Sequence, residues 1–398
     1  MEELNEATRR FIEAHRRDDI ARLALQLTGR TDIDARLALT QIEGWQRLQA
    51  KVPSWAAQPD LRYPPRLSLE QCSGEAAARY KVRLVQRLVS HRDGMADLTG
   101  GLGVDFAFLA PLFRRAVYVE RQAVLCRLAR HNLPLVGAPH AEVKEADAVA
   151  ALDSLPPLDL LFIDPARRDA AGRKTVCLAD CEPDLERLAL RLLDKAGTVL
   201  AKLSPMLDLS EALSTLPHVA EAHVVAEGGE CKELLVVMQR TAGGEPLIVC
   251  ADGRLGFHPS EEVGALPHYA TQPHRYLYEP EASVLKAGAF RLTAARYGLE
   301  KLHPNSHLYT ADRLVTDFPG RTFEVTACSG MGRAQLRTLL GEKPKANLSV
   351  RNFPATVAEL RKRLKLHDGG DTYLFATTLA DGAHVLLVCR KVSAAGPK

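Results

Sequence analysis

Three glycines gather in the stretch DLTGGLGVD, which spans residues 97–105 and contains Gly100, Gly101 and Gly103. A short apolar run at 94–96 precedes it, and apolar, helix-forming residues at 106–110 follow it. We therefore expect a strand-to-helix turn, where backbone can approach a ligand closely and the helix offers free N–H groups. A dinucleotide fingerprint would need a glycine at position 106, where Phe106 stands, so the pattern disfavours NAD. Taken alone, it also fits an ordinary glycine-rich turn.

A carboxylate ends the next predicted strand. The apolar run at 116–119 stops at Glu120, which lies 23 residues beyond Asp97. An ionised carboxyl accepts hydrogen bonds on two oxygens, so it suits both hydroxyls of a ribose. An interval of about 20 residues between the glycine turn and such a carboxylate is typical of nucleotide-binding α/β domains. Glu120 is therefore predicted to bind the ribose of a nucleoside ligand.

Strand-like and helix-like segments alternate from this turn to about residue 240, a pattern typical of a doubly wound, mostly parallel sheet. A single helix is expected over 70–88, before the first strand, and another over 185–193, with Gly197 as its cap. Strands are predicted at 141–144, 158–163 and 198–203, and the Gly-Gly turn at 228–229 indicates a closing hairpin.

The glycine stretch resembles motif I of class I S-adenosylmethionine (SAM) methyltransferases, D-x-G-x-G-x-G. Asp97, Gly101 and Gly103 match it, and Thr99 replaces the first glycine. The resemblance implies SAM as cofactor and places Asp147 against the adenine amino group, although Asp147 would serve equally well as a helix N-cap. The residues expected to bind the cofactor are Asp97, Thr99, Gly100, Gly101, Gly103, Asp105, Glu120, Asp147, Asp164 and Pro165.

The loop after the strand at 158–163 is the candidate reaction site, because ligands of open α/β sheets lie beyond the carboxyl ends of the strands. It reads Asp164-Pro165-Ala166-Arg167-Arg168, at the place where many nucleic-acid methyltransferases carry [DNS]-P-P-[YFW]. Asp164 is expected to orient or deprotonate the attacking atom. Arg167 replaces the stacking ring and is expected, with Arg168 and Lys202, to contact a substrate base or phosphate. The alternative for the two arginines is a pair of solvated loop charges.

Over its whole length the sequence resembles the bacterial class I SAM-dependent methyltransferases that carry a ferredoxin-like segment and a C-terminal THUMP-like domain. DLTGGLGVD, DPARRD, GECKELL and YLYEPEASVLKAGAF carry this resemblance. It implies an α/β, Rossmann-like domain with a doubly wound, mostly parallel seven-stranded sheet, an N-terminal helical domain and a C-terminal α+β module. The expected boundaries are 1–70 (helical domain), 71–244 (methyltransferase domain), 245–325 (ferredoxin-like segment) and 326–398 (THUMP-like domain).

Charge is distributed unevenly along the 398 residues. Residues 326–398 hold twelve Lys and Arg against five Asp and Glu, whereas the whole chain carries a net charge of only +3. A basic module of this kind favours a polyanionic partner, and RNA is the partner expected here. Lys343, Lys345, Arg351, Arg361, Lys362, Arg363 and Lys365 would supply phosphate contacts, and Phe353 either a stacking ring or a core residue.

The composition limits the classes of protein that this sequence can encode. Apolar residues make up 46% and charged residues 25%, no run is long enough to span a membrane, and the N-terminus lacks the apolar core of a signal peptide. We expect a cytoplasmic protein. The eight cysteines form no CxxC pair, so no metal site is expected. Arg79, Tyr80 and Lys81 lie near the expected cofactor pocket, although a solvated helix face is favoured for them.

The sequence therefore predicts a SAM-dependent methyltransferase that acts on RNA, either ribosomal or transfer RNA, through its C-terminal module. The catalytic residues expected are Asp164, Arg167 and Lys202. The alternatives are a methyltransferase for a protein or a small molecule, and a non-catalytic module that binds SAM or RNA. The sequence indicates neither the methylated atom nor the oligomeric state.

Overall fold

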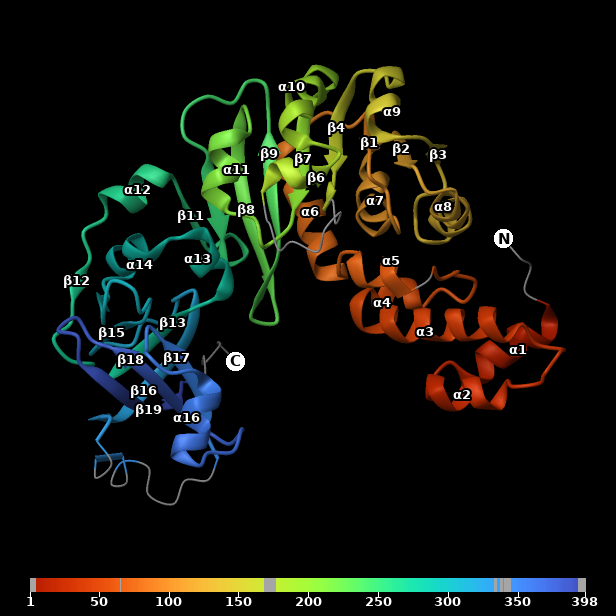
Figure 1. Ribbon diagram of the computed structural model, residues 1–398. Helices are drawn as coiled ribbons and strands as arrows, with labels where there is room; N and C mark the ends of the chain where they lie inside the picture. Colours follow the sequence, from red (N-terminus) through yellow and green to blue (C-terminus); the bar gives the residue numbers. More distant parts are fainter. Residues whose placement is uncertain are drawn as a thin grey trace. The chain divides into compact units, whose positions relative to one another are not determined.

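The structure is a computed structural model that describes residues 5–64, 66–167, 177–332, 335–336, 339 and 345–392. Its internal contacts divide the chain into two compact units. The first comprises residues 1–220 and 235–243, and the second comprises residues 221–234 and 244–398. Figure 1 gives the course of the chain and the element labels used below.

The N-terminal part of the first unit is helical, as expected for residues 1–70. Asn5, Asp19 and Asp34 cap the first three helices by accepting hydrogen bonds from backbone N–H groups, which favours helix initiation at these points. The helices are α1 (Glu6–His15), α2 (Ile20–Gln26), α3 (Ala35–Lys51), α4 (Pro53–Ala56) and α5 (Arg66–Gln71).

The single helix predicted over 70–88 is wrong, because the chain leaves the helical conformation between α5 and α6 (Glu75–Leu88). Gly74 is extended, with φ −78° and ψ 159°, and it forms the N-cap of α6. The side chain of Ser73 is buried and donates a hydrogen bond to Asp105. The interruption thus brings a hydroxyl into the interior, which the apolar pattern of the helix could not reveal.

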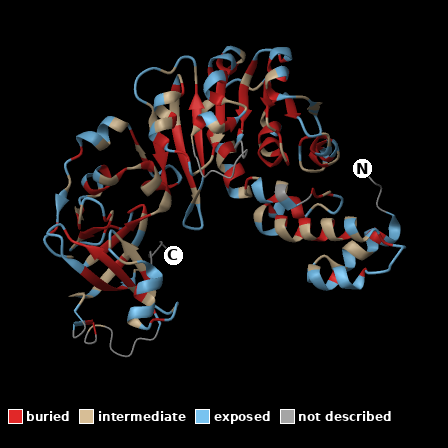
Figure 2. Cartoon of the chain, in the orientation of Figure 1, coloured by how far each residue is buried: buried red, intermediate tan, exposed pale blue. Residues whose placement is uncertain are grey.

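The predicted α/β sheet is present and larger than expected. Nine strands have the order β11-β10-β8-β9-β7-β4-β1-β2-β3, and β1 pairs in parallel with both β2 and β4. The buried strands appear in red at the centre of Figure 2. The bounds are β1 (Gly94–Asp97), β2 (Arg115–Glu120), β3 (Ala141–Glu145), β4 (Leu158–Ile163), β7 (Ala196–Leu203), β8 (Val219–Glu227), β9 (Glu230–Met238), β10 (Leu247–Cys250) and β11 (Leu255–Phe257).

Seven strands were expected, and the two additional ones follow Gly244 in the sequence. β10 pairs in parallel with β8, and β11 pairs antiparallel with β10. The connecting helices are α7 (Val104–Leu109), α8 (Ala123–Leu135), α9 (Ala148–Ser154), α10 (Leu185–Lys195) and α11 (Leu209–Thr215). The predicted cap at Gly197 is wrong: Ala196, already extended, ends α10 and begins β7, so Gly197 lies within the strand.

The direction of strand order reverses at β1. From β1, the strands β2 and β3 follow on one side, and β4 and β7 follow on the other. In an open α/β sheet this reversal opens a crevice beyond the carboxyl ends of the two neighbouring strands, which is where such folds bind ligands. Asp97 ends β1 and Asp164 follows β4, so both residues lie at this crevice.

The second unit contains an eight-stranded sheet of order β12-β14-β15-β13-β16-β19-β18-β17. Its strands are β12 (His268–Tyr269), β13 (Tyr276–Pro280), β14 (Glu300–Lys301), β15 (Tyr309–Ala311), β16 (Gly320–Gly330), β17 (Asn347–Arg351), β18 (Thr372–Thr378) and β19 (His384–Lys391). The helices of this unit are α12 (Pro259–Gly264), α13 (Ala282–Ala287), α14 (Phe290–Tyr297) and α16 (Val357–Leu364).

The buried apolar residues of this second unit fall into several clusters. Leu277 and Leu308 pack in the same cluster as Phe375 and Leu387, which come from the C-terminal strands. Phe353 is half-buried against a neighbouring cluster and contacts His384 edge to face, as expected for a core residue. Within the described part of the chain, no helix has the length and apolar character needed to cross a membrane.

Candidate active site

The glycine turn is shaped by the ring of Tyr118 on β2. A Cβ atom on Gly100 would lie 2.2 Å from Cε2 of this ring, so no larger residue fits without a shift. Gly101 and Gly103 have φ values of +56° and +87°, in the left-handed region that favours glycine. The Tyr118 hydroxyl donates a hydrogen bond of 2.5 Å to the Gly101 carbonyl. The turn is therefore a rigid, closely packed backbone surface at the end of β1.

Glu120 is tied to this turn through its side chain. One carboxylate oxygen accepts the Gly101 N–H at 2.9 Å, and the other accepts the Gln122 N–H at 2.8 Å. The side chain is buried, so these two bonds fix the orientation of the carboxylate. Each carboxylate oxygen can accept more than one hydrogen bond, which leaves capacity for the two hydroxyls of a ribose.

Asp97 is buried beneath the turn. Its Oδ1 accepts the Thr99 N–H at 2.9 Å. Burial raises the pKa of the Asp97 carboxyl to about 8; the hydrogen bond from Thr99 opposes this shift, and the nearby carboxylates of Asp105 and Asp164 add to it. A large part of Asp97 is therefore protonated near pH 7 in the unliganded protein, and a cation placed beside it would favour ionisation.

Thr99 connects the turn to the loop after β4. The backbone N–H of Asp164 donates a hydrogen bond of 2.6 Å to Oγ1 of Thr99. A glycine at position 99, as in the motif that this stretch resembles, could not make this bond. The hydroxyl of Thr99 therefore holds the end of β4 against the end of β1.

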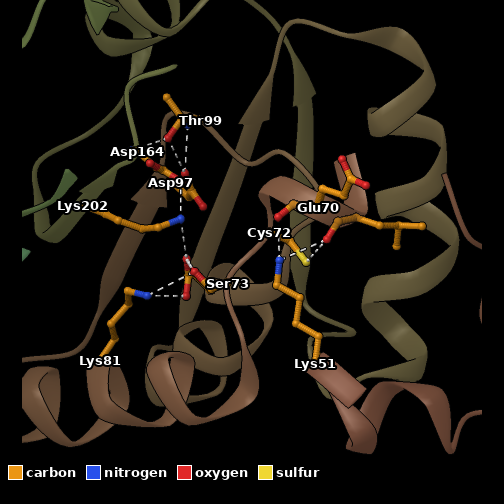
Figure 3. A network of polar contacts seen from close by, with 11 residues as sticks. Lys51, Glu70, Cys72, Ser73, Lys81, Asp97, Thr99, Asp164 and Lys202 are labelled. Atoms are coloured by element: carbon orange, nitrogen blue, oxygen red, sulfur yellow. Dashed lines mark hydrogen bonds and ion pairs between the residues drawn. The ribbon is translucent and has the colours of Figure 1, made fainter. Parts of the chain in front are cut away.

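Two lysines and two carboxylates form a chain of ion pairs behind this loop (Figure 3). Nζ of Lys202, which comes from β7, lies 2.5 Å from Oδ2 of Asp164 and 3.7 Å from Oδ2 of Asp105. Nζ of Lys81, which comes from α6, lies 2.9 Å from Oδ1 of Asp105. Positive and negative charges thus alternate from Lys81 to Asp164.

Lys81 is completely buried, so the expected solvated helix face is wrong for this residue. It contacts Asp105, and its Nζ also lies 3.3 Å from Oγ of Ser73. Arg79, by contrast, is exposed and pairs with Glu75, as a solvated face predicts. The distinction follows from the helix period, because Lys81 falls on the same side of α6 as the buried Ala77, Ala78, Leu84 and Val85.

Asp105 is engaged on both oxygens. Ser73 donates to Oδ2 at 2.6 Å, and Lys81 donates to Oδ1. Burial would raise the pKa of Asp105, but the charges of Lys81 and Lys202 together with the Ser73 hydrogen bond lower it below its usual value. Asp105 is therefore an ionised anchor for the two lysines.

The remaining predicted site residues do not belong to this network of ion pairs, or they lie outside the described residues. Asp147 caps α9 by accepting the N–H groups of Val149 and Ala150, which was the alternative given for it. Pro165 is buried directly after Asp164. Arg168 lies outside the described residues, as does the side chain of Arg167. Sequence reasoning missed Ser73 and Tyr118. It placed Lys81 near the expected cofactor pocket but favoured a solvated face, although the apolar positions of α6 around Lys81 indicated burial.

The comparisons with known proteins agree with this geometry. Residues 276–319 match a family model for a ferredoxin-like domain, and residues 320–391 match one for a THUMP-like domain. A crystal structure of a proposed methyltransferase from Porphyromonas gingivalis is similar over 97% of this chain and 98% of its own, with 40% identity and a TM-score of 0.86. A protein of Mycobacterium tuberculosis named as an S-adenosylmethionine-dependent methyltransferase is 29% identical over 81% of this chain and 87% of its own length.

The strand reversal at β1, the glycine turn and these similarities define a class I SAM-dependent methyltransferase, which confirms the predicted fold class, enzyme class and cofactor. More narrowly, the chain belongs to the bacterial family of such enzymes that carry a ferredoxin-like segment and a C-terminal THUMP-like domain.

Proposed function

We propose that this enzyme methylates RNA, and that its C-terminal module binds the RNA. The proposal rests on the THUMP-like match over 320–391 together with the excess of seven positive charges within residues 326–398. Phosphate contacts dominate the affinity of proteins for nucleic acids, so a basic module attached to a methyltransferase domain favours this substrate class.

The basic residues of this module divide into two groups. Arg361 pairs with Asp368, and Arg351 shares the buried carboxylate of Glu279 with Arg321, so both guanidinium groups already have a carboxylate partner. Lys345, Lys362, Arg363 and Lys365 are exposed and are the phosphate contacts that we assign, while Lys343 lies outside the described residues.

We assign the cofactor site to the end of β1. The turn at Gly100, Gly101 and Gly103 permits close approach of a ligand, and the fixed carboxylate of Glu120 suits the ribose hydroxyls. Asp97, Thr99 and Pro165 complete the site between β1 and β4, with Asp147 toward the adenine. SAM supplies a methyl group on a positively charged sulfonium, and the raised pKa of Asp97 fits a buried carboxyl that becomes ionised beside a cation.

Asp105 takes a different role in this proposal. Its oxygens are used by Ser73 and Lys81, so we assign it to positioning Lys202 rather than to direct contact with the cofactor. Lys202 in turn holds Oδ2 of Asp164.

Asp164 is the residue that we assign to the attacking atom of the substrate. Lys202 and the Thr99 hydroxyl fix its carboxylate and its backbone, so its Oδ1 is the acceptor proposed to orient a nucleophilic N–H or O–H group and to receive its proton. Methyl transfer needs mainly proximity and alignment, and two fixed contacts on one residue supply that alignment. Arg167 is proposed to bind the substrate.

The test is transfer of labelled methyl groups from SAM to RNA, protein and metabolite fractions of a strain that lacks the gene. We expect label in the RNA fraction with the wild-type protein and none with Glu120→Ala, which removes the ribose carboxylate. Label in the protein or metabolite fraction alone would refute an RNA substrate, and absence of label from every fraction would favour a binding module.

A further inference from the structure

The N-terminal helices and α8 enclose a pocket of about 280 Å³ within the first unit. Its walls come from α1, α3, the segment 58–63 and α8. This volume is close to the lower end of small-molecule sites, which span about 300–1,000 Å³. None of the residues assigned above to the cofactor or the methyl acceptor lines it. The lining includes Arg9, Arg16, Trp45, Arg62 and Tyr63, which carry the argument below.

The pocket is built on a rigid frame. Gln41 of α3 binds both the N–H and the carbonyl of Tyr63, each at 3.0 Å. Asn132 of α8 binds the N–H and the carbonyl of Arg62 in the same way, at 3.0 and 2.7 Å. Gly44 makes room for Tyr63, because a Cβ atom there would lie 2.3 Å from Cβ of the tyrosine. The wall that carries Tyr63 is thus held from both sides.

Two polar groups of residues that line the pocket are buried without a partner among the described residues: the hydroxyl of Tyr63 and Nε of Arg16. Tyr63 is only 7% exposed. Burial raises the pKa of its phenol to about 12, with the charge of Arg16 opposing the shift, so the hydroxyl keeps its proton. Buried donors are normally satisfied, and two unsatisfied donors on residues that line one cavity point to a ligand that carries acceptor oxygens.

The charge of the lining favours an anion. The lining includes three arginines, Arg9, Arg16 and Arg62, and two acidic residues, Glu13 and Asp60, so positive charges are in excess. Guanidinium groups match the geometry of phosphate oxygens better than ammonium groups do.

The rest of the lining favours a ligand with a planar or apolar part. The Arg16 guanidinium lies 5.3 Å from the centroid of the Trp45 ring, and Ile12, Leu61 and Leu135 add apolar surface. Stacked arginine and aromatic groups of this kind are suited to nucleobases. A nucleotide combines an oxyanion with a flat base and has a size that fits this volume.

We propose that this pocket binds one nucleoside monophosphate unit, with its phosphate oxygens accepting from Tyr63 and Arg16. The unit can come from a free mononucleotide or from the phosphorylated end of an RNA strand. This site is separate from the methyl-transfer site and does not depend on the function proposed above.

The experiment titrates the full-length protein with uridine and cytidine 5′-monophosphate, using tryptophan fluorescence and calorimetry as readouts. These pyrimidine nucleotides lack adenine, so an adenosyl site does not take part. We expect saturable binding that is at least about tenfold tighter than for uridine and cytidine, because the phosphate makes the assigned contacts. Glu120→Ala should bind them as wild type does, so failure of the cofactor assignment and failure of this one are distinguishable.

Tyr63→Phe and Arg16→Gln should each weaken nucleotide binding about tenfold or more. Arg10→Gln is the matched control, because Arg10 is an exposed residue of α1 outside the lining. Tyr63→Phe removes a hydroxyl without a partner among the described residues, so the melting temperature of this variant should not fall below that of the wild type. The Tyr63→Phe variant therefore still tests the proposal if Arg16→Gln fails to fold.

A 5′-phosphorylated oligouridylate distinguishes the two sources. The same oligonucleotide without its 5′-phosphate is the control for RNA binding by the C-terminal module. Tighter binding of the phosphorylated oligonucleotide than of both this control and the mononucleotide assigns the site to an RNA end, and any other order assigns it to free nucleotides. The proposal is overturned if none of these probes binds saturably at millimolar concentration, if nucleosides bind as well as nucleotides, or if Tyr63→Phe binds as wild type does.

Discussion

Replacing Lys81 by methionine tests the ion-pair chain behind the active site. The change keeps an unbranched side chain but removes an ammonium group that is fully buried, 2.9 Å from Oδ1 of Asp105. Removing one partner of a buried pair costs about 3–5 kcal/mol, because the other charge stays buried. Ser73 and Lys202 still contact Asp105 in the variant, so we expect a decrease of about 3 kcal/mol in the free energy of unfolding, at the lower end of that range.

A double-mutant cycle separates this pairing from simple loss of packing. Lys81→Met and Asp105→Leu should each destabilise the protein, whereas the double variant should cost less than their sum, with a coupling of about 1–3 kcal/mol. Urea unfolding at pH 7, followed through Trp45 and Trp55, measures all four proteins. Arg79→Met is the control: Arg79 lies two residues earlier on an exposed face and should cost no more than about 1 kcal/mol.

The pH dependence gives an independent check. The pKa of Asp105 is lower in the folded protein than in the unfolded chain, so its charged form contributes stability at pH values above about 4. This contribution disappears as the pH falls through the lowered pKa. A Lys81→Met protein within about 0.5 kcal/mol of wild type, the usual scatter of surface substitutions, would refute the reasoning, as would additive energies in the cycle.

Two further predictions follow from the charges of the site and of the C-terminal module. The pKa of Asp97 is raised to about 8, so the native state holds a proton that the unfolded chain releases above about pH 4. The free energy of unfolding of the wild type should therefore fall as the pH rises from about 5 to 8. Asp97→Asn should remove this part of the pH dependence, as measured by urea unfolding. An equal slope in both proteins would contradict the shift. The double variant Lys362→Gln/Lys365→Gln should weaken RNA binding. It should also reduce the slope of log affinity against log salt concentration by about 0.7 for each phosphate that it no longer neutralises. An unchanged slope would exclude these lysines as phosphate contacts.

Substitution is a better test of the module than deletion. Removing residues 326–398 would cut β16 within the strand and remove β18 and β19. Leu277 and Leu308, outside the deleted part, share their hydrophobic cluster with Phe375 and Leu387 inside it. A truncated protein would therefore lose half of the buried residues of this cluster.

The fold was predictable because the local sequence patterns match the strands and turns of the first sheet. The strand predicted at 158–163 is β4, and the Gly-Gly turn at 228–229 joins the hairpin of β8 and β9. The extension by β10 and β11 was not predicted, because two short strands that follow a loop carry no signal of the sheet they join.

The chemistry of the site was predictable only where it lies at strand ends. Asp97 and Asp164 end neighbouring strands, and this follows from the alternating pattern. Lys81, which pairs with Asp105, comes from α6, a helix distant in sequence from β4 and β7. The spacing of residues along the chain therefore gave no indication of this ion pair. The N-terminal pocket was missed for the same reason, since Arg16, Tyr63 and His131 are brought together only by packing.

The central claim is that this enzyme transfers a methyl group to RNA with Asp164 beside the attacking atom. Single-turnover transfer of labelled methyl from SAM to the RNA fraction tests it most directly, with SAM affinity measured in parallel by calorimetry. We predict that wild type labels RNA and that Asp164→Ala retains SAM affinity within several-fold while its transfer rate falls by about 10²–10⁴. Transfer by Asp164→Ala at the wild-type rate would contradict the account.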